Sequence, residues 1–147
     1  MELKFEKLQA KHIEELVRAF KTNVPDFFLE NEVKPFEDYL NGPIEYYEVV
    51  SDESDIIGAG GFATEKEGEA RIVWYLVHRE KHGKGIGRQM LERHIEIIKK
   101  SKKFESISLM TSQHTDGFYK SLGFNTTREE KNYWGEGMHL VYMEMVL

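Results

Sequence analysis

IVWYLVHREKHGKGIGRQMLERHIEIIKK, residues 72–100, is the stretch that decides the fold of this chain. Its first six residues, IVWYLV (72–77), form the longest unbroken apolar run of the sequence, which predicts a buried strand. Residues 78–87 contain glycine at positions 83, 85 and 87 and predict a loop. Apolar residues then recur at helical spacing, which predicts a core-facing helix; they are Met90, Leu91, Ile95 and Ile98.

The junction between this loop and this helix has the features of an anion-binding site. The first N–H groups of a helix have no partner within the helix, and the helix dipole adds partial positive charge there. Glycines let a ligand approach the backbone closely, and the segment also contains Lys81, Lys84 and Arg88. We therefore expect a phosphate or pyrophosphate site. A tight strand–helix connection without a ligand would give the same short pattern.

Two common phosphate-binding loops do not match this segment. A P-loop needs G-x-x-x-x-G-K-[ST], which does not occur in the chain. The dinucleotide fingerprint G-x-G-x-x-G would need glycine at position 88 or 90, where the chain has Arg88 and Met90.

The loop resembles the cofactor loop of the GNAT acyltransferases. His82-Gly83-Lys84-Gly85-Ile86-Gly87 is similar to that family's [Q/R]-x-x-G-x-[G/A], and Val77-His78-Arg79 before it is similar to V-x-P. The chain departs from the pattern at His82, where the family has Gln or Arg, and at Arg79, which replaces a proline. A histidine has little effect if contacts at this position come from the backbone, and weakens cofactor binding if they come from the side chain.

A second segment, Phe-Tyr-Lys-Ser-Leu-Gly-Phe at 118–124, resembles the family's F-Y-x-x-x-G-F motif. Its own pattern predicts a short helix that ends at Gly123 in a left-handed conformation, with Phe124 packed behind it. The resemblance implies that Tyr119 lies beside the cofactor sulfur and acts as general acid, because a phenol can protonate a departing thiolate. Seven residues before Tyr119, where many family members have a cofactor-contacting asparagine, this chain has Ser112.

The remaining pattern interleaves strands and helices. Strands are predicted at 3–8, 44–50, 55–63, 70–77, 104–110, from 123 and at 138–147, and helices at 10–20, 35–40 and 112–122. We expect an α/β fold (an α+β sandwich), and the resemblance implies a GNAT-like central mixed, mostly antiparallel sheet flanked by helices. Glycines at 58, 60 and 61 predict a bulge or a close backbone approach. The aromatic residues at 27–28 either pack in the core or line an acceptor pocket.

The resemblance covers residues 44–147 by element order, and the first forty residues match only in their strand–helix–helix pattern. It implies direct transfer of an acetyl group from acetyl-CoA to a primary amine, with both substrates bound together. A longer acyl donor, and a CoA-binding module without turnover, stay open as alternatives. The residues implied to contact the cofactor are Val77, His82, Gly83, Lys84, Gly85, Ile86, Gly87, Arg88 and Ser112.

Direct transfer requires a neutral amine, so a base or a water path is needed. Glu48, His78 and His114 are candidate bases, and the sequence does not choose among them. Ser112, His114 and Asp116 are the residue types of a hydrolase triad, but they lie within one helix start, where capping is the better interpretation.

Composition limits the other functions. The chain has 147 residues, of which 40% are hydrophobic and 31% charged, and we expect a single domain over 1–147. The absence of cysteine excludes disulfides, thiolate metal sites and a cysteine nucleophile. We expect no metal site at HREKH (78–82), which matches neither H-E-x-x-H nor H-x-x-E-H. A net charge of −6 argues against nucleic acid and is compatible with a cationic acceptor.

The N-terminal residues 1–17 (MELKFEKLQAKHIEELV) contain charges throughout, without the apolar region of a signal peptide. No segment approaches the length that crosses a membrane. We therefore expect a cytoplasmic protein that acts on a small-molecule or peptide amine; a homodimer is left open.

Overall fold

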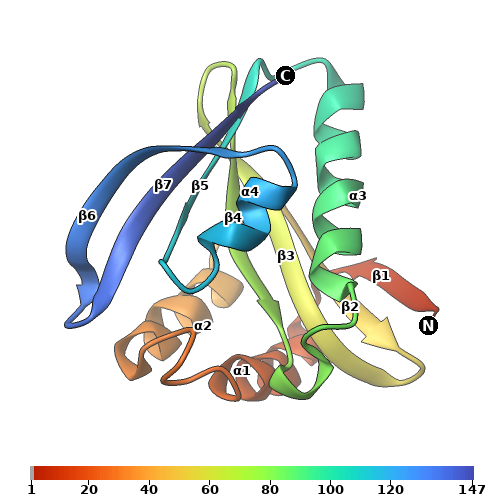
Figure 1. The fold of residues 1–147 in the computed structure, drawn as a ribbon. Helices are drawn as coiled ribbons and strands as arrows, with labels where there is room; N and C mark the ends of the chain where they lie inside the picture. The colour runs from red at the N-terminus through yellow and green to blue at the C-terminus, as the bar shows by residue number, and fades with distance from the viewer. Residues whose placement is uncertain (1) are drawn as a thin grey trace.

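The computed structural model describes residues 2–147 and consists of one seven-stranded sheet with helices on both faces (Figure 1). The strands are β1 (Leu3–Lys7), β2 (Tyr46–Asp52), β3 (Asp55–Lys66), β4 (Glu69–Val77), β5 (Ser106–Thr111), β6 (Asn125–Gly135) and β7 (Met138–Val146). The α-helices are α1 (Ile13–Lys21), α2 (Val33–Asn41), α3 (Ile86–Ser101) and α4 (Asp116–Ser121). Three short 3₁₀ helices are η1 (Ala10–His12), η2 (Glu30–Glu32) and η3 (Arg79–Lys81).

The strand order is β1-β2-β3-β4-β5-β7-β6, and every neighbouring pair is antiparallel except β4–β5. Helices α1 and α2 pack against one face of the sheet, and α3 and α4 lie on the other (Figure 1). The predicted fold class, a mixed and mostly antiparallel sheet flanked by helices, is confirmed.

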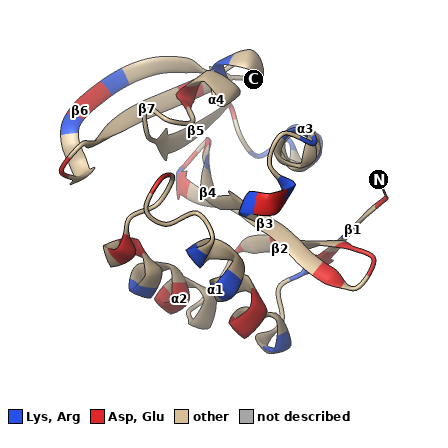
Figure 2. Cartoon of the chain, turned by 60° about the horizontal axis from the view of Figure 1, so that its bottom comes forward, with Lys and Arg blue, Asp and Glu red and all other residues tan. Residues whose placement is uncertain are grey.

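The edge strand β6 contains a run of charged residues, and Figure 2 shows basic and acidic residues following one another along it. The exposed residues there are Arg128, Glu129, Glu130 and Lys131. Charged side chains on an edge strand discourage pairing with the sheet of another molecule.

The helices follow the predicted apolar stripes. The predicted 10–20 helix consists of η1 and α1, and Leu16, Val17 and Phe20 are buried. Phe20 stacks on Phe28 and Phe36 with ring centroids 4.3 Å and 4.5 Å apart. Phe28 therefore contributes to the core, which is one of the two roles expected for the aromatics at 27–28.

The parallel pair β4–β5 holds together at only three positions. Residues 69–71 pair with 106–108, and beyond Arg71 the two strands diverge (Figure 1). The predicted strand at 72–77 is therefore only partly buried: Ile72 and Leu76 are buried, whereas Trp74 and Tyr75 are half-buried. The apolar run predicts the strand correctly, but it gives no sign that the strand loses its neighbour on one side.

A bulge at Trp74 changes which way β4 points its side chains. Trp74 has φ +43°, and the register of β3 against β4 shifts between Ala59 and Gly61. As a result Trp74 packs against the α1–α2 cluster, and the next residue, Tyr75, packs under α3. A Cβ atom on Gly60 would lie 2.5 Å from the Tyr75 ring, so the close backbone approach predicted from the glycines is confirmed.

Candidate functional site

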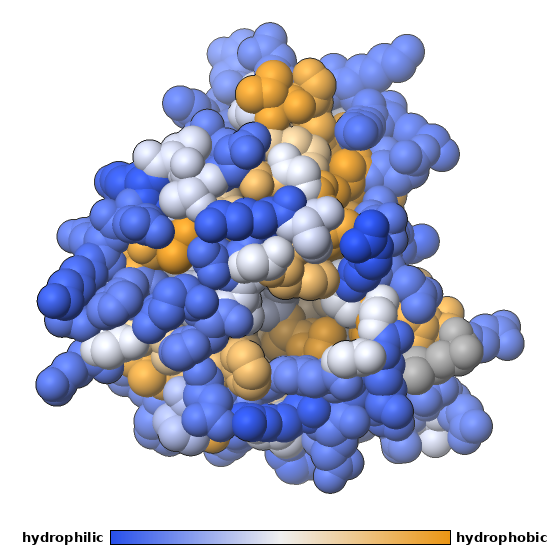
Figure 3. Space-filling model, in the orientation of Figure 1, coloured by the Kyte–Doolittle hydropathy of each residue, from blue (hydrophilic) through white to orange (hydrophobic). Residues whose placement is uncertain are grey.

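The gap between the diverging strands is a cavity of about 720 Å³, visible in Figure 3 as a hollow with an apolar floor. Residues 71–77 of β4 form one wall and residues 109–111 of β5 form another. The loop before α3 and the helix α4 line one end. The segment between α1 and α2 lines the cavity from Phe27, whose ring lies 5.1 Å from that of His82, to Glu32. Side chains of both sheet faces therefore meet in one space.

The glycine-rich loop presents unpaired amides to this cavity. Gly83 and Gly85 have φ +77° and +79°, the left-handed region that glycine adopts without strain. The first helical hydrogen bond runs from the Gln89 N–H to the Gly85 carbonyl oxygen (3.1 Å). The amides of residues 86–88 precede that bond and have no helical acceptor. Lys81 and Arg88 line the same end of the cavity, whereas Lys84 does not line it.

His82 fastens the loop to the end of β4. Its Nε2 donates to the Val77 carbonyl oxygen (2.8 Å), and the side-chain amide of Asn23 donates to the same oxygen (3.0 Å). The His82 ring also meets the Phe27 ring edge-on at 5.1 Å. The side chain that departs from the family pattern thus makes its contacts within the protein.

The backbone of Val77 faces the cavity. The N–H of His78 donates to the Ile57 carbonyl oxygen (2.7 Å), so His78 and Ile57 form a hydrogen-bonded pair of the antiparallel ladder. In such a ladder the polar groups of the next residue point the opposite way. The Val77 N–H is therefore directed away from β3, into the gap that β5 leaves open.

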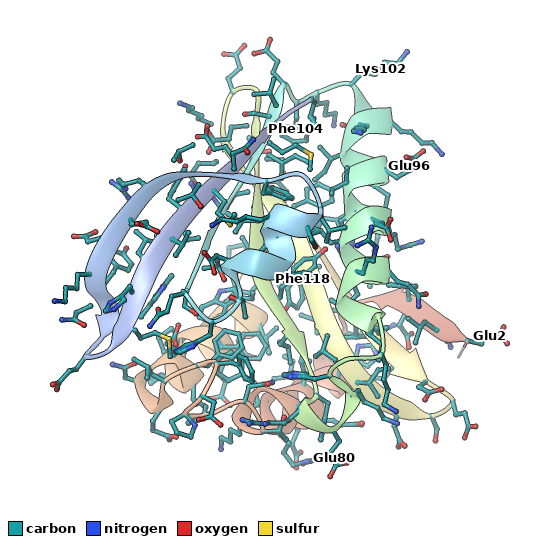
Figure 4. The ribbon with its side chains drawn as sticks, viewed as in Figure 1. Glu2, Glu80, Glu96, Lys102, Phe104 and Phe118 are labelled. Atoms are coloured by element: carbon teal, nitrogen blue, oxygen red, sulfur yellow. The ribbon has the colours of Figure 1, made fainter. Side chains whose placement is uncertain are left out.

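Tyr119 reaches the cavity from α4. Phe118 and Tyr119 both line it, and Figure 4 shows Phe118 on α4 between α3 and the diverging strands. Burial raises the pKa of Tyr119 well above its usual range, so the phenol is protonated at neutral pH. Gly123, with φ +104°, follows the helix, and Phe124 is buried behind it.

Ser112 is buried at the end of β5 and also lines the cavity. Its hydroxyl oxygen accepts from the N–H of His114 (3.3 Å) in the turn before α4. The predicted capping is not observed, because the N-cap residue of α4 is Thr115 and, within residues 2–147, no side chain caps the helix. The ring of His114 faces a different cavity.

Of the three candidate bases, none lines the main cavity. His78 accepts through Nδ1 from the N–H of Glu80 (3.2 Å) at the start of η3. Glu48 lies beneath α3, where it accepts from Arg93 Nε and Nη2 (3.0 and 2.9 Å) and from His94 Nε2 (2.8 Å). Burial alone would raise the pKa of Glu48, but the bonds from His94 and Arg93 lower it to about 2, which makes this carboxylate a poor proton acceptor.

The network around Glu48 was not predicted from the sequence. His94 is fully buried, and its Nδ1 accepts from the hydroxyl of Tyr75, whose ring lines the main cavity. The sequence did contain a signal: His94 lies on the apolar face of α3, next to Arg93, and a polar residue on a buried face needs hydrogen-bond partners. The network fixes Tyr75, and with it the bulged part of β4.

A second residue missed by the sequence analysis is Glu32, at the end of η2. Among residues 2–147 it is the only acidic residue that lines the main cavity. One of its carboxylate oxygens accepts from the Leu29 N–H (2.8 Å), and burial raises the pKa of the carboxyl. The sequence offers no clear signal for it, because the N-cap residue Leu29 lacks the side-chain oxygen of a capping box.

A smaller cavity of about 420 Å³ adjoins the first beneath the β6–β7 hairpin. It shares Phe27 and Met138 with the main cavity. Its lining residues are Pro25, Asp26, Phe27, Leu29, His114, Glu136, Gly137 and Met138.

Within the described residues 2–147, no group of three His, Cys, Asp or Glu side chains is arranged to hold a metal ion. None of the helices in that range is long and apolar enough to cross a bilayer.

Comparison with known proteins shows which family has this architecture. The sequence model of the acetyltransferase (GNAT) domain matches residues 11–147. The chain belongs to the GNAT acetyltransferase family. The match begins well before residue 44, where the resemblance by element order started, so the α1–α2 region is part of the family domain. No curated protein matches the sequence.

Solved structures of GNAT proteins share the fold at low sequence identity. Ard1 from Thermoplasma volcanium superposes with a TM-score of 0.83 at 19% identity, covering 100% of this chain and 99% of that one. The ribosomal-protein-S18-alanine N-acetyltransferase of Escherichia coli gives 0.80 at 17%, covering 99% and 94%. An aminoglycoside 6′-N-acetyltransferase complexed with coenzyme A gives 0.77 at 12%, covering 97% and 96%.

Proposed function

We propose that this GNAT protein transfers an acetyl group from acetyl-CoA to a primary amine, directly and with both substrates bound. The observation that supports this most is the single cavity that joins the unpaired amides before α3 to the hydroxyl-bearing residue Tyr119. Its volume, about 720 Å³, is within the usual range of small-molecule sites. We further propose that the acceptor is a small-molecule or peptide amine of the cytoplasm, without nucleic acid or membrane as partner.

The residues present fit the parts of acetyl-CoA. The amides of residues 83–88 and the side chains of Lys81 and Arg88 would hold the pyrophosphate, since a helix N-terminus and nearby cations favour anions. The apolar walls formed by β4 and β5 suit the pantetheine arm, and the inward-facing N–H of Val77 would bind its amide or thioester oxygen. Ser112 lines the same space and contributes a hydroxyl.

In the reaction, the amine nitrogen forms a bond to the acetyl carbon as the carbon–sulfur bond breaks. The Val77 N–H stabilises the negative charge that develops on the thioester oxygen. Tyr119 gives its proton to the departing sulfur. Burial raises the pKa of Tyr119. The same apolar surroundings raise the pKa of the CoA thiol, so the pKa values of the proton donor and the proton acceptor shift in the same direction.

The loop is tested by titrating acetyl-CoA into the protein by calorimetry, with NADH as comparator. Gly85→Glu introduces a carboxylate at a left-handed position facing the phosphates and should abolish binding. Gly137→Glu is the matched control, because Gly137 also has positive φ (+78°) and open space around it, but lies at the β6–β7 turn. If neither variant changes the affinity, or if the wild type does not bind millimolar acetyl-CoA, the proposed function is wrong.

A further inference from the structure

The two ends of the main cavity differ in charge. The end formed by the loop and α3 has Lys81, His82 and Arg88, and the opposite end has Glu32. The remaining cation of the lining, Arg71, is engaged: its Nε donates to Ser108 (2.8 Å) and its Nη2 to the hydroxyl of Tyr142 (2.8 Å). The cavity therefore has one end suited to an anion and one suited to a cation.

Glu32 retains a free acceptor oxygen at its end. Its Oε2 accepts from the Leu29 N–H (2.8 Å), which is the one hydrogen bond of this carboxylate within residues 2–147. The side chain is only partly buried, and the residue lines the cavity. A carboxylate that is partly desolvated and not fully bonded attracts a positively charged donor group.

Aromatic side chains surround the same space. Phe27 and Phe28 precede Glu32 in the α1–α2 segment, Trp74 comes from the bulge of β4, and Trp134 comes from β6. Trp134 is fixed by its Nε1, which donates to the Thr111 carbonyl oxygen (3.0 Å). Aromatic faces attract ammonium groups and offer apolar contact to whatever carries them. An acceptor with an anionic group would instead meet Glu32 with a like charge.

The smaller cavity contributes further acidic residues beside the main cavity. It adjoins the main cavity at Phe27 and Met138. The β6–β7 turn packs on the α1–α2 segment there, since a Cβ atom on Gly135 would meet the side chain of Leu29. Glu136 at this turn is exposed and has no ion pair within residues 2–147, whereas Asp26 is paired with Arg79 (2.6 Å). The unpaired carboxylate of Glu136 therefore adds to the negative charge beside the main cavity.

We propose that Glu32 binds the ammonium group of the acceptor and takes its proton, and that the acceptor is an alkyl or arylalkyl amine without a neighbouring carboxylate. This inference rests on the proposed acetyl transfer. The carboxylate of Glu32 takes one proton of the ammonium group and later releases it to solvent. The neutral amine forms the new carbon–nitrogen bond, the carbon–sulfur bond breaks, and the second amine proton replaces the one that Tyr119 gives to sulfur.

Glu32 also has a structural role, because it caps η2 through Leu29, and the test must separate the two roles. Glu32→Gln retains a side-chain oxygen for the Leu29 N–H but removes the charge and the basicity. Glu30→Gln, in the same 3₁₀ helix and exposed, is the matched control. Glu32→Asp retains a carboxylate and should recover part of the activity.

The substrates for the test are acetyl-CoA with phenethylamine, and with phenylalanine as its carboxylate-bearing counterpart. We expect the wild type to prefer phenethylamine by more than about tenfold in kcat/KM, since like charges at a binding site oppose the amino acid. Glu32→Gln should lower kcat/KM for phenethylamine by about 100-fold or more. The affinity for acetyl-CoA, measured by calorimetry, should not change in Glu32→Gln or in Glu30→Gln.

The pH profile gives a readout that a structural role would not move. Activity should fall on the acid side as Glu32 protonates, at a pH above the ordinary glutamate range because burial raises its pKa, and Glu32→Gln should lack this limb. The other titratable residues that line the cavity are Arg71, Tyr75, Lys81, His82, Arg88 and Tyr119, and those of the adjoining cavity are Asp26, His114 and Glu136. Because His82 lines the same cavity, the limb must persist in His82→Gln.

The outcomes separate this inference from the function on which it rests. A wild type that acetylates none of a panel of amines refutes the proposed function. A wild type that acetylates phenethylamine while Glu32→Gln matches it, or loses acetyl-CoA affinity in parallel, refutes the role of Glu32. A preference for phenylalanine refutes the acceptor class.

Discussion

The two ends of the cavity are built from different parts of the chain. At the α3 end the groups that meet a ligand are mostly backbone amides, placed by Gly83, Gly85 and the first turn of the helix. At the α1–α2 end they are side chains, Glu32 and the aromatic residues around it. A site of backbone amides needs a fixed sequence of glycines, and a site of side chains can be reached from many sequences. The difference explains why a short motif marks the first end and none marks the second.

Tyr119→Phe should have the largest effect, because Tyr119 is the one side chain at the α3 end to which the chemistry assigns a proton. We expect turnover to fall by about 100-fold or more, with the affinity for acetyl-CoA unchanged because the backbone amides remain. Steady-state kinetics and calorimetry measure the two quantities. Tyr133→Phe, at an exposed tyrosine on β6, is the control and should match the wild type.

Two other results would change that comparison. Equal losses of turnover and affinity would mean that the Tyr119 hydroxyl holds the cofactor, so that the α3 end also depends on side chains. Undiminished turnover would leave the protein without a general acid at this position. A protein that binds acetyl-CoA but acetylates nothing would be a CoA-binding module.

Glu48→Gln tests whether buried side chains support the backbone end of the site. The pKa of Glu48 in the folded protein is lowered to about 2 from 4.5, so its contribution to stability is fully present above pH 4.5 and is lost as the pH falls toward 2. This difference in pKa corresponds to about 3 kcal/mol of unfolding free energy. We expect the wild type to lose about that much more unfolding free energy than Glu48→Gln between pH 5 and pH 2.

Urea unfolding at several pH values measures this difference. Glu92→Gln, at an exposed glutamate on the outer surface of α3, is the control and should follow the wild type. Parallel pH curves for the wild type and Glu48→Gln would show that the network with His94 and Arg93 does not stabilise the folded state through its charge.

Gly60→Ala should have a smaller effect on stability and should act on the bulge. The new methyl group would lie 2.5 Å from the Tyr75 ring, so the ring or the strand must move. We expect a loss of about 1–3 kcal/mol in unfolding free energy by urea denaturation. Gly117→Ala, in α4 with no atom near the added methyl, should instead be neutral or slightly stabilising. An unchanged stability in Gly60→Ala would show that β4 is not held tightly at its bulge.

The limits of sequence-based prediction in this chain follow the same division. The periodicity of α1 and α3, the strand at 72–77 and the positive φ of Gly123 could be predicted because each depends on local spacing or on a local backbone requirement. The divergence of β4 from β5 could not, since it depends on where pairing between distant strands stops. Glu32 was missed because its role depends on burial and on neighbours from β4 and β6, which only the folded chain brings together.

His82→Gln should have the smallest effect, on the affinity for acetyl-CoA, and it tests most directly whether the α3 end binds through its backbone. It restores a residue type of the GNAT loop at position 82, where this chain departs from the [Q/R]-x-x-G-x-[G/A] motif. His82 donates to the Val77 carbonyl oxygen (2.8 Å), a bond that a glutamine amide can also make, and Asn23 donates to the same oxygen (3.0 Å). We expect acetyl-CoA affinity to stay within about threefold of the wild type. A threefold change corresponds to less free energy than one typical neutral hydrogen bond contributes. His82→Ala, which removes the donor, is the comparison and should weaken binding more. A large gain in affinity from glutamine would show that the side chain itself contacts the cofactor, and that the loop does not bind through its backbone alone.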